Sequence, residues 1–467
     1  MMKKAICAAV LAVAACILPG CMCGAEPSEI GDFTKYVRDI RELTIPEGTR
    51  IVALGEATHG NREFQQSKRE VFEILSEKND IRALVIEGDF GGCSIINDYI
   101  QGGDGDEREM TKLLGYRLYR TDDMLELIRW MRDHNASAAD DHNASAADDH
   151  NASAADDHSA SAADDHNASA ADDHSASAAD DHNASAADDH KVRLYGMDIQ
   201  SSIFNVSFLK EFYAKAAPER AAEISGDLED LFGTEEDGYD PSRADEIIAY
   251  TDALAEDLAD NADAYAAATG RDRHFRACLA AEALKRYINY REKENFSHKY
   301  RDGSMKDLTD RILAFEEEEH GSELMIACHN GHMTKNQSSN FTFLGKYLYE
   351  ELKDAYFAIG TDFYITSCNL PGKDGRMVKE FCSDDPLAYN MKDSELDKGL
   401  LVFSEVDEDS ELYPYITESI PTGSLGEGYS PLMMLMKNQY QVYFAPEEMY
   451  DAMILYYETT PTEIWTD

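Results

Sequence analysis

The sequence predicts an α/β protein, in which crossover helices cover a parallel β-sheet core and a helical subdomain and a low-complexity loop are inserted. Three observations lead to this class. Short β-rich runs alternate with helical patterns along the chain. One long stretch is rich in Ala, Glu, Leu and Lys and has little β character. An octapeptide repeat, which has no large apolar residue, interrupts the alternation.

The β-rich runs and the helices between them define the predicted sheet. We expect strands at 50–57, 82–87, 192–198, 324–330 and 356–363. Helical apolar spacing at 63–78 and 124–132 predicts crossover helices. Two later stretches, 432–443 and 449–457, are apolar and aromatic enough to pack on the core. Because strands and crossover helices alternate, the strands are expected to run parallel.

The chain divides into a signal peptide, an α/β domain and two insertions. Residues 30–133 and 190–467 form the predicted α/β domain, and 205–297 form the helical subdomain within it. Residues 134–189 repeat the unit HNASAADD or HSASAADD seven times. Each unit carries two aspartates, and burial of its small side chains cannot offset the entropy of ordering it. We therefore predict that the repeat is disordered.

The N-terminus predicts export. Two lysines precede an apolar run over 5–18 that is too short to span a membrane, so residues 1–20 are expected to be a secretion signal. The sequence LPGC that ends at Cys21 resembles a bacterial lipobox, in which Cys21 would become the lipid-modified first residue. The sequence CGA at 23–25 offers a competing, ordinary cleavage site. We expect an extracytoplasmic protein that a lipid holds to the membrane.

The net charge, the cysteine spacing and the absence of certain motifs argue against several classes of protein. The formal net charge of −48 repels nucleic acid phosphates, so nucleic acid is not an expected partner. The cysteines beyond the signal are scattered without a CxxC pair, which predicts neither a disulfide framework nor a structural zinc site. The sequence has no GxSxG, P-loop or HExxH motif, which argues against a serine hydrolase, a nucleotide enzyme and a zincin.

Four motifs lie at the ends of predicted strands. They are GEATHG at 55–60, EGD at 87–89, GMD at 196–198 and HNGH at 329–332. Loops at the carboxyl ends of parallel strands converge on one region of a sheet. The motifs would therefore bring imidazoles and carboxylates together, which is costly to bury without a purpose. This convergence predicts one functional site that includes His59, Glu56, Glu87 and Asp198.

Several of these residues, taken alone, are also explained by a purely structural role. Glu87 is equally well explained as a helix cap or an ion-pair partner. His329 and His332 are open to three interpretations, which are metal ligands, a general acid and base, or a structural pair bonded to the backbone. Cys328 points to the opposite face of the strand from His329, which favours a buried structural thiol over a nucleophile.

Without a nucleophile motif, water is the expected nucleophile. An imidazole with a pKa of about 6.5 takes a proton from water near neutral pH, especially if a carboxylate orients its other nitrogen. His59 with Glu56 or Glu87 fits that arrangement. Arg301 and Asp302 precede the fourth strand and are open to two interpretations. Either Asp302 caps a helix and Arg301 enters the site, or the pair is a plain surface cap.

In this order, the motifs resemble the erythromycin esterase family. The matching segments are GEATHGNREF at 55–64, IEGD at 86–89, YGMD at 195–198, YRDGSM at 300–305 and HNGHM at 329–333. The resemblance spans 33–363 and includes FAIGTDF at 357–363. It implies a carboxylic ester hydrolase that opens macrolide lactones without a metal or another cofactor. Asp307 and Gly88-Asp89 depart from the family pattern, which bears on the substrate more than on the chemistry.

The resemblance also implies roles for single residues. His59 would activate water, and Glu56 and Glu87 would position His59 and the water. His329 and His332 would assist at the substrate oxygen or the leaving group. Arg301 and Asp198 would bind the substrate. The expected partner is thus a small ester or lactone, and no motif indicates an oligomeric state.

Two other hypotheses compete with a hydrolase. In the first, His59, His329, His332 and a carboxylate hold a metal or haem, and the chain is an extracytoplasmic binding lipoprotein. Stoichiometric bound metal would favour it. In the second, the acidic repeat is a cation-binding or interaction tract on a carrier domain. A phenotype on deletion of 134–189 would favour that hypothesis.

Overall fold

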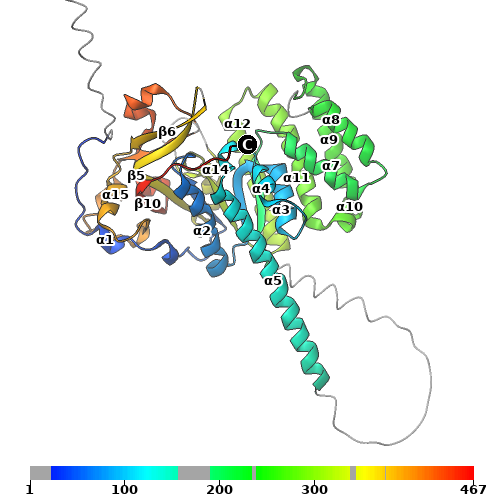
Figure 1. Ribbon diagram of the computed structural model, residues 1–467, viewed down its shortest axis with the longest axis horizontal. Coiled ribbons are helices and arrows are strands. Elements are labelled where there is room, and N and C mark those ends of the chain that lie inside the picture. The colour runs from blue at the N-terminus through cyan, green and yellow to red at the C-terminus, as the bar shows by residue number, and fades with distance from the viewer. Residues whose placement is uncertain are drawn as a thin grey trace, which may run out of the picture. The chain divides into compact units, whose positions relative to one another are not determined.

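The structure is a computed structural model that describes residues 23–155, 190–233, 238–336, 343–373, 375–426 and 428–466. The chain divides into two units (Figure 1). Unit 1 comprises Ala57–Glu63, Thr361–Thr462 and the described part of Met1–Glu42. Unit 2 comprises Leu43–Glu56, Phe64–Gly360 and the described residues from Glu463 on. The predicted signal and Cys21 lie outside the described residues.

Unit 2 holds the predicted parallel sheet. Its strands are β1 (Ile51–Glu56), β2 (Ala83–Asp89), β3 (Arg193–Asp198), β4 (Leu324–His329) and the first part of β5 (Tyr356–Gly372). They lie in the order β3-β2-β4-β1-β5, and neighbouring strands are parallel. The α/β class and all five predicted strands are confirmed. β5 continues past Phe363, where buried and partly exposed residues begin to alternate and the continuous apolar run ends.

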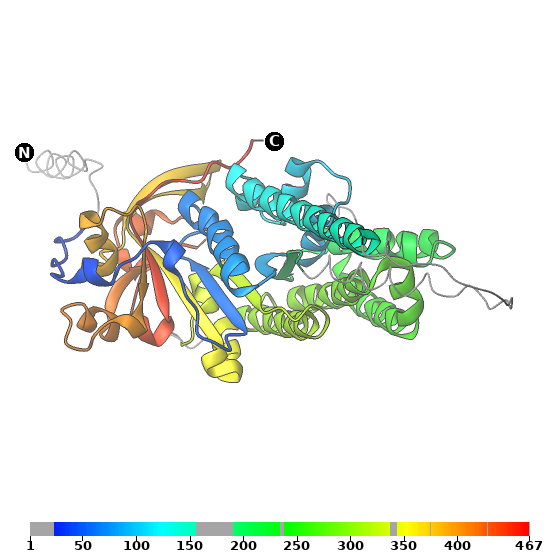
Figure 2. The same ribbon diagram turned by 90° about the horizontal axis from the view of Figure 1, so that it is seen from below.

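Helices connect these strands and form a separate group after β3 (Figure 1, Figure 2). The connecting helices are α2 (Arg62–Asn79), α3 (Phe90–Ile100), α4 (Glu107–Lys112), α5 (Asp122–Ala155), α12 (His298–Glu319), α13 (Asn330–Met333) and α14 (Leu344–Leu352). The group after β3 contains α7 (Ile203–Ala216), α8 (Ala221–Phe232), α9 (Ala244–Asp260), α10 (Ala262–Thr269) and α11 (Arg271–Ile288). These helices occupy the stretch that the sequence predicts to be a helical subdomain.

Unit 1 is built on the second part of β5. β6 (Gly375–Cys382) pairs antiparallel with β5, β10 (Ala452–Thr459) follows β5 in the strand order, and β7 (Gly399–Val402) pairs antiparallel with β10. β8 (Ile420–Gly423) and β9 (Gln441–Phe444) form a separate antiparallel pair. The short helices are α1 (Phe33–Tyr36), α15 (Pro386–Asn390), α16 (Tyr413–Thr417) and α17 (Pro446–Met449).

Two expectations for unit 1 are wrong. Cys23 forms a disulfide with Cys382, which sequence analysis missed because Cys23 was grouped with the signal. The stretch 432–443 does not pack as a whole on the core, because Leu435 is 75% exposed. In contrast, most of 449–457 is buried as predicted, since β10 lies inside the sheet. No helix among the described residues is long and apolar enough to cross a membrane.

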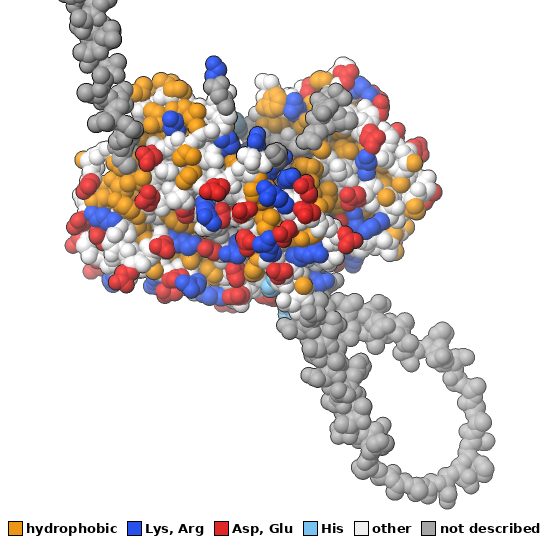
Figure 3. Space-filling model, viewed as in Figure 1, with side chains coloured by type: hydrophobic (Ala, Val, Ile, Leu, Met, Phe, Trp, Pro, Cys, Tyr) orange, Lys and Arg blue, Asp and Glu red, His pale blue; other side chains and the backbone are white. Residues whose placement is uncertain are grey.

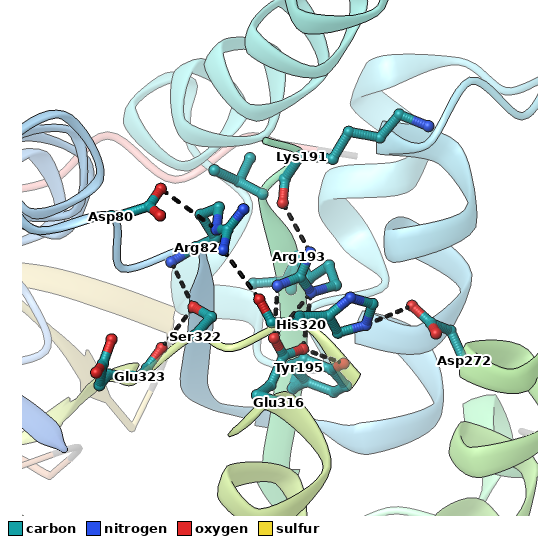
Figure 4. Close-up of polar contacts among 12 residues, drawn as sticks. Asp80, Arg82, Lys191, Arg193, Tyr195, Asp272, Glu316, His320, Ser322 and Glu323 are labelled. Carbon is teal, nitrogen blue, oxygen red and sulfur yellow. Dashed lines mark hydrogen bonds and ion pairs between the residues drawn. The ribbon is translucent and has the colours of Figure 1, made fainter. Parts of the chain in front are cut away.

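A buried polar cluster fixes α12 at the amino end of β3 (Figure 4). Arg193 Nη2 lies 2.6 Å from Glu316 Oε2, and the two side chains are 3% and 0% exposed. The Tyr195 hydroxyl donates to Glu316 Oε1 at 2.6 Å. Arg301 precedes Glu316 by four helical turns, or about 22 Å along the helix axis. The cluster therefore sets the direction in which α12 carries Arg301 to the carboxyl edge of the sheet.

Hydrogen bonds between Asn135 and Val192 join the two ends of the repeat where it enters and leaves the fold; we call this pair of residues the seam. Asn135 Nδ2 donates to the carbonyl oxygens of Ile100 at 3.1 Å and Val192 at 3.0 Å. The Val192 N–H donates to Asn135 Oδ1 at 2.7 Å. Helix α5 continues to Ala155, and residues 156–189 lie outside the described residues, so the disorder of the repeat stays a prediction.

Deletion of residues 142–189 is expected to leave the melting temperature and the catalytic rate unchanged. Asn135 and Val192 remain, and a shorter flexible loop costs slightly less entropy to close. Thermal unfolding and turnover of the two chains measure the effect. Asn135→Ala in the shortened chain is the control, and it should cost about 1–3 kcal/mol because buried polar groups lose their bonds. A slower or less stable deletion variant would assign the repeat a role.

Candidate active site

Arg301 lies at the centre of a buried cluster at the carboxyl ends of β2 and β3. Its Nη2 lies 2.6 Å from Glu87 Oε1 and 2.6 Å from Asp198 Oδ2. Its Nε donates to Asp198 Oδ1 at 2.9 Å, which makes the Asp198 contact bidentate. All three side chains are less than a tenth exposed. One guanidinium thus pairs with two buried carboxylates from neighbouring strands and offsets one of their two negative charges.

The charges in this cluster shift one another's pKa. Burial alone would lower the pKa of Arg301, but Asp198 and Glu87 raise it well above its ordinary value. Burial alone would raise the pKa of Asp198, but Arg301 lowers it below its ordinary value. Burial and Asp198 raise the pKa of Tyr116, whose hydroxyl donates to Asp198. At neutral pH, Arg301 and Asp198 are therefore charged and Tyr116 is a neutral donor.

His332, on α13, joins the cluster through both ring nitrogens. Its Nδ1 lies 2.7 Å from Asp302 Oδ1, and Asp302 Oδ1 also accepts the backbone N–H of Leu344 at 3.0 Å. Its Nε2 lies 3.2 Å from Arg301 Nη1 and 3.5 Å from Glu87 Oε1. Since Arg301 can only donate, Nε2 is the acceptor in this arrangement and the ring proton is on Nδ1.

Opposing effects act on the protonation of His332. Burial lowers its pKa and so does Arg301, whereas Glu87 and Asp302 raise it, and the balance lies above the ordinary value. A proton that reaches Nε2 would break the contact with Arg301 and be stabilised by Glu87. His332 can therefore take up and release a proton at Nε2 while Asp302 holds the ring in place.

His329 is oriented by backbone contacts at the end of β4. Its backbone N–H donates to Glu87 Oε2 at 3.0 Å, and its Nδ1 accepts the backbone N–H of Gly331 at 3.1 Å. Because Nδ1 is an acceptor, the neutral ring carries its proton on Nε2. The preceding residue, Cys328, is buried and burial raises its pKa well above the ordinary value, which confirms the prediction of a structural thiol.

Glu56 ends β1 beside β4 and is paired with a lysine. Its strand register places it opposite His329. Its carboxylate forms an ion pair with Lys68 of α2, and both side chains are only 2% exposed. Lys68 Nζ also lies 5.6 Å from the ring centroid of Tyr119. The positive charge of the buried lysine compensates the negative charge of Glu56. The ion pair therefore holds this carboxylate in one orientation.

Gly55 allows α13 to approach β1. A Cβ atom at this position would lie 2.1 Å from Asn330 Oδ1 and 3.1 Å from Asn330 Cα. Backbone atoms cannot move away as easily as a flexible side chain. The close approach therefore requires glycine and sets the position of the HNGH turn that carries His332.

Gly55→Ala is expected to destabilise the protein by about 1–3 kcal/mol, because the new methyl group overpacks the contact with Asn330. It should also slow the reaction, since the turn that holds His332 is displaced. Gly303→Ala is the matched control, because a Cβ atom there meets nothing within 4 Å. Denaturant unfolding and turnover measure both variants, and equal behaviour of the two would contradict the argument.

His59 belongs to unit 1 and lies in the turn that follows β1. The Thr58 hydroxyl donates to Asn61 Oδ1 at 2.6 Å. Asn61 Nδ2 donates to the carbonyl oxygens of Ser367 at 3.0 Å and Thr460 at 2.9 Å. These bonds fix the backbone on both sides of half-buried His59. The expectation that His59 lies close to the carboxylates of Glu56 and Glu87 stays a prediction.

The sequence predicts some of the residues in this site and gives no sign of others. Helix α12 begins at His298 with Ser297 as its N-cap, so the interpretation of Asp302 as a cap is wrong and it instead orients His332. Lys68 was missed, although a lysine among the apolar positions of a predicted helix signals a buried partner. The sequence does not predict Tyr116 as a site residue, because it follows no predicted strand and belongs to no motif.

The neighbouring Asp89 serves the fold. Its side chain accepts the backbone N–H of Gly92 at 2.8 Å and thereby caps α3. Burial raises its pKa to about 7. Over the described parts of both units, no three or more His, Cys, Asp or Glu side chains are grouped so that they could hold a metal ion.

The protein thus has an α/β fold with a site at the carboxyl ends of its parallel strands, and this site combines buried carboxylates, a guanidinium and histidines. The chain belongs to the erythromycin esterase family, because the family model described as erythromycin esterase matches residues 76–147 and 180–459. Membership makes the protein a hydrolase of the erythromycin esterase type that acts on a small molecule. The match continues through most of unit 1, beyond the region in which the motifs lie.

Solved structures share this fold at low sequence identity. A Bacillus cereus protein is 18% identical with a TM-score of 0.65, over 94% of this chain and 100% of that one. A succinoglycan biosynthesis protein is 17% identical with a TM-score of 0.64, over 93% and 97%. A histidine-to-asparagine variant of the erythromycin esterase EreC, in its open conformation, is 15% identical with a TM-score of 0.54, over 88% and 91%.

Proposed function

We propose that the protein hydrolyses a carboxylic ester or lactone with water that His59 activates, and without a metal. The observation that carries this proposal is the cluster around Arg301, in which acids, a fixed cation and a proton-exchanging histidine meet at the carboxyl ends of parallel strands. A hydrolase needs these groups for proton transfer and for the charge that develops on the substrate oxygen.

In the proposed reaction, His59 removes a proton from water as its oxygen attacks the acyl carbon. Glu56 and Glu87 position His59 and the water. The charge on the carbonyl oxygen is stabilised by donors that include Arg301, and His332, which enters the cycle protonated at Nε2 as well as Nδ1, gives the Nε2 proton to the departing alkoxide. The products are a carboxylic acid and an alcohol, and the proton that His59 took from water passes through solvent to Nε2 of His332, which restores both histidines.

The proposed absence of a metal is supported by the position of Arg301. Glu87 and Asp198 are the carboxylates that would attract a cation at this edge of the sheet. Both are already bonded to the guanidinium at 2.6 Å. Arg301 thus supplies the positive charge that a metal ion would bring to these oxygens.

The test is turnover of an ester panel by the mature protein. The panel contains macrolide lactones, aryl esters and acylated sugars, and the reaction runs in oxygen-18 water with metal content measured in parallel. We expect a product with one heavy oxygen in its carboxyl group and a rate that survives chelation. His59→Ala should lower that rate at least about a hundredfold, as expected when a general base is lost.

His298→Ala is the matched control, because His298 is an exposed histidine at the start of α12. It should keep the wild-type rate. Equal rates in the His59 and His298 variants would remove His59 from the mechanism. A rate that returns only with added divalent metal would overturn the metal-free proposal and favour a metal-dependent site.

We also propose that the protein is exported and carries a lipid on Cys21. Disulfides persist in oxidising compartments, and Cys23 is bonded to Cys382. Cleavage at the competing site after Ala25 would remove Cys23 and break this pairing. Cleavage before Cys21 keeps it, so the disulfide supports the lipoprotein alternative.

A further inference from the structure

The segment 432–436 is an exposed run of apolar side chains in unit 1. Leu432, Leu435 and Met436 are 51%, 75% and 45% exposed, and the two methionines between them are partly exposed. Hydrophobic side chains are visible on this part of unit 1, beside β6 (Figure 3). A run of exposed apolar residues is unfavourable in water and marks an interaction surface.

This apolar run adjoins the first described residues of the chain. Asp384 connects them, because its carboxylate accepts the backbone N–H of Gly24 at 3.0 Å and forms an ion pair with Lys437. Gln441 Nε2 donates to the same carboxylate at 3.0 Å. The disulfide between Cys23 and Cys382 fastens the chain at the same place. Cys23 and Gly24 are therefore held beside the run.

We propose that residues 432–436 enter the lipid surface to which the N-terminus is anchored, so that unit 1 faces the membrane in one orientation. This inference rests on the proposed lipid at Cys21. Two residues of extended chain span at most about 7 Å, so a lipid on Cys21 would lie within that length of Cys23. Such a short tether brings the neighbouring apolar run to the bilayer at high effective concentration.

The chemistry of the run fits a neutral lipid surface. It contains only leucine and methionine, and Lys437, which follows it, is already paired with Asp384. The net charge of −48 opposes approach to anionic lipid, whereas zwitterionic headgroups do not repel it. Flexible methionine and leucine side chains adapt to the boundary between headgroups and acyl chains.

The test compares tryptophans at two exposed apolar positions. Leu435→Trp reports on the run, and Phe296→Trp, at a site 48% exposed in unit 2, is the matched control. Each full-length variant is expressed with its signal and reconstituted into phosphatidylcholine vesicles that carry brominated acyl chains. We expect the added emission of Leu435→Trp to shift to the blue and to be mostly lost to quenching. The emission of Phe296→Trp should be unchanged.

Mass spectrometry of the N-terminal peptide separates the two proposals. If Cys21 carries lipid and both tryptophans respond alike, the inference is overturned and the anchor stands. If Cys21 carries no lipid but Leu435→Trp is still quenched when vesicles are added, the membrane surface stands and the anchor fails. A Leu435→Trp signal that shifts with protein concentration and not with lipid would assign the run to a second copy, which also overturns the inference.

Discussion

Replacing Arg301 with methionine is expected to lower the catalytic rate about a thousandfold and the free energy of unfolding by about 3–5 kcal/mol. The substitution keeps an unbranched apolar stem but removes the guanidinium that contacts Glu87 and Asp198. Those carboxylates are 7% and 1% exposed, so water cannot replace the lost cation. Steady-state kinetics and denaturant unfolding measure the two effects.

The stability loss at Arg301 should depend on pH. Without the guanidinium, the pKa of Asp198 rises in the folded protein, and the carboxyl stays protonated to a higher pH. A raised folded pKa adds stability at low pH that is lost as pH rises, so the variant should be impaired more at about pH 8 than at about pH 5. Arg311→Met makes the same change at a 45% exposed site on α12 and should cost less than about 1 kcal/mol. Equal losses in both variants would contradict the argument.

A second large effect is expected from a buried carboxyl pair in unit 1. Asp362 and Asp385 are completely buried. Asp362 accepts the backbone N–H groups of Phe363 at 2.7 Å and Gly423 at 2.9 Å. Burial and the charge of Asp385 raise the pKa of Asp362 well above its ordinary value, and burial raises the pKa of Asp385 to about 6. The two carboxyls therefore hold a proton between them near neutral pH.

This pair should make wild-type stability fall by at least about 3 kcal/mol as pH rises from about 4 to about 8, because Asp385 alone accounts for that amount and Asp362 adds to it. The folded state holds the proton of Asp385 more tightly than the unfolded chain, whose aspartates have an ordinary pKa of 3.8. The stability is therefore complete below that value and is lost as pH rises through about 6. Asp362→Asn replaces the proton of Asp362 by a permanent amide donor to Asp385, so it should remove the part of this pH dependence that comes from Asp362.

Thermal unfolding across the pH range measures that dependence. Asp407→Asn is the matched control, because Asp407 is 61% exposed and pairs with Lys35 at the surface. Its pH profile should follow the wild type. A profile of Asp362→Asn that keeps the wild-type slope would show that other groups control the pH response.

The sheet was predictable because strands buried on both faces read as continuous apolar runs. β1 and β4 are such strands, and Glu56 at the end of β1 lies opposite His329 at the end of β4, as expected from parallel topology. Asp198 and Glu87 come together for the same reason, since β2 and β3 are neighbours. The edge of the sheet and the acidic residues on it could therefore be predicted from the sequence.

Other contacts depend on tertiary geometry that no local pattern encodes. The pairing of Asp302 with His332 depends on the rotation of α12 and on the turn after β4. The pairing of Cys23 with Cys382 joins residues 359 positions apart. Local spacing assigned Asp302 to a cap and Cys23 to the signal, because each fits that local pattern.

The bonds of Asn135 close the fold independently of the number of octapeptide copies that follow it. The first octapeptide begins with the His-Asn pair whose asparagine closes the seam on Val192, and every later copy begins with His-Asn or His-Ser. When whole copies are lost or gained, the bonds to Val192 remain wherever the first copy begins with His-Asn, whereas a copy that begins with His-Ser lacks the amide that makes them. The fold is therefore expected to accept inserts whose length differs in steps of eight residues, as long as an asparagine stands at position 135.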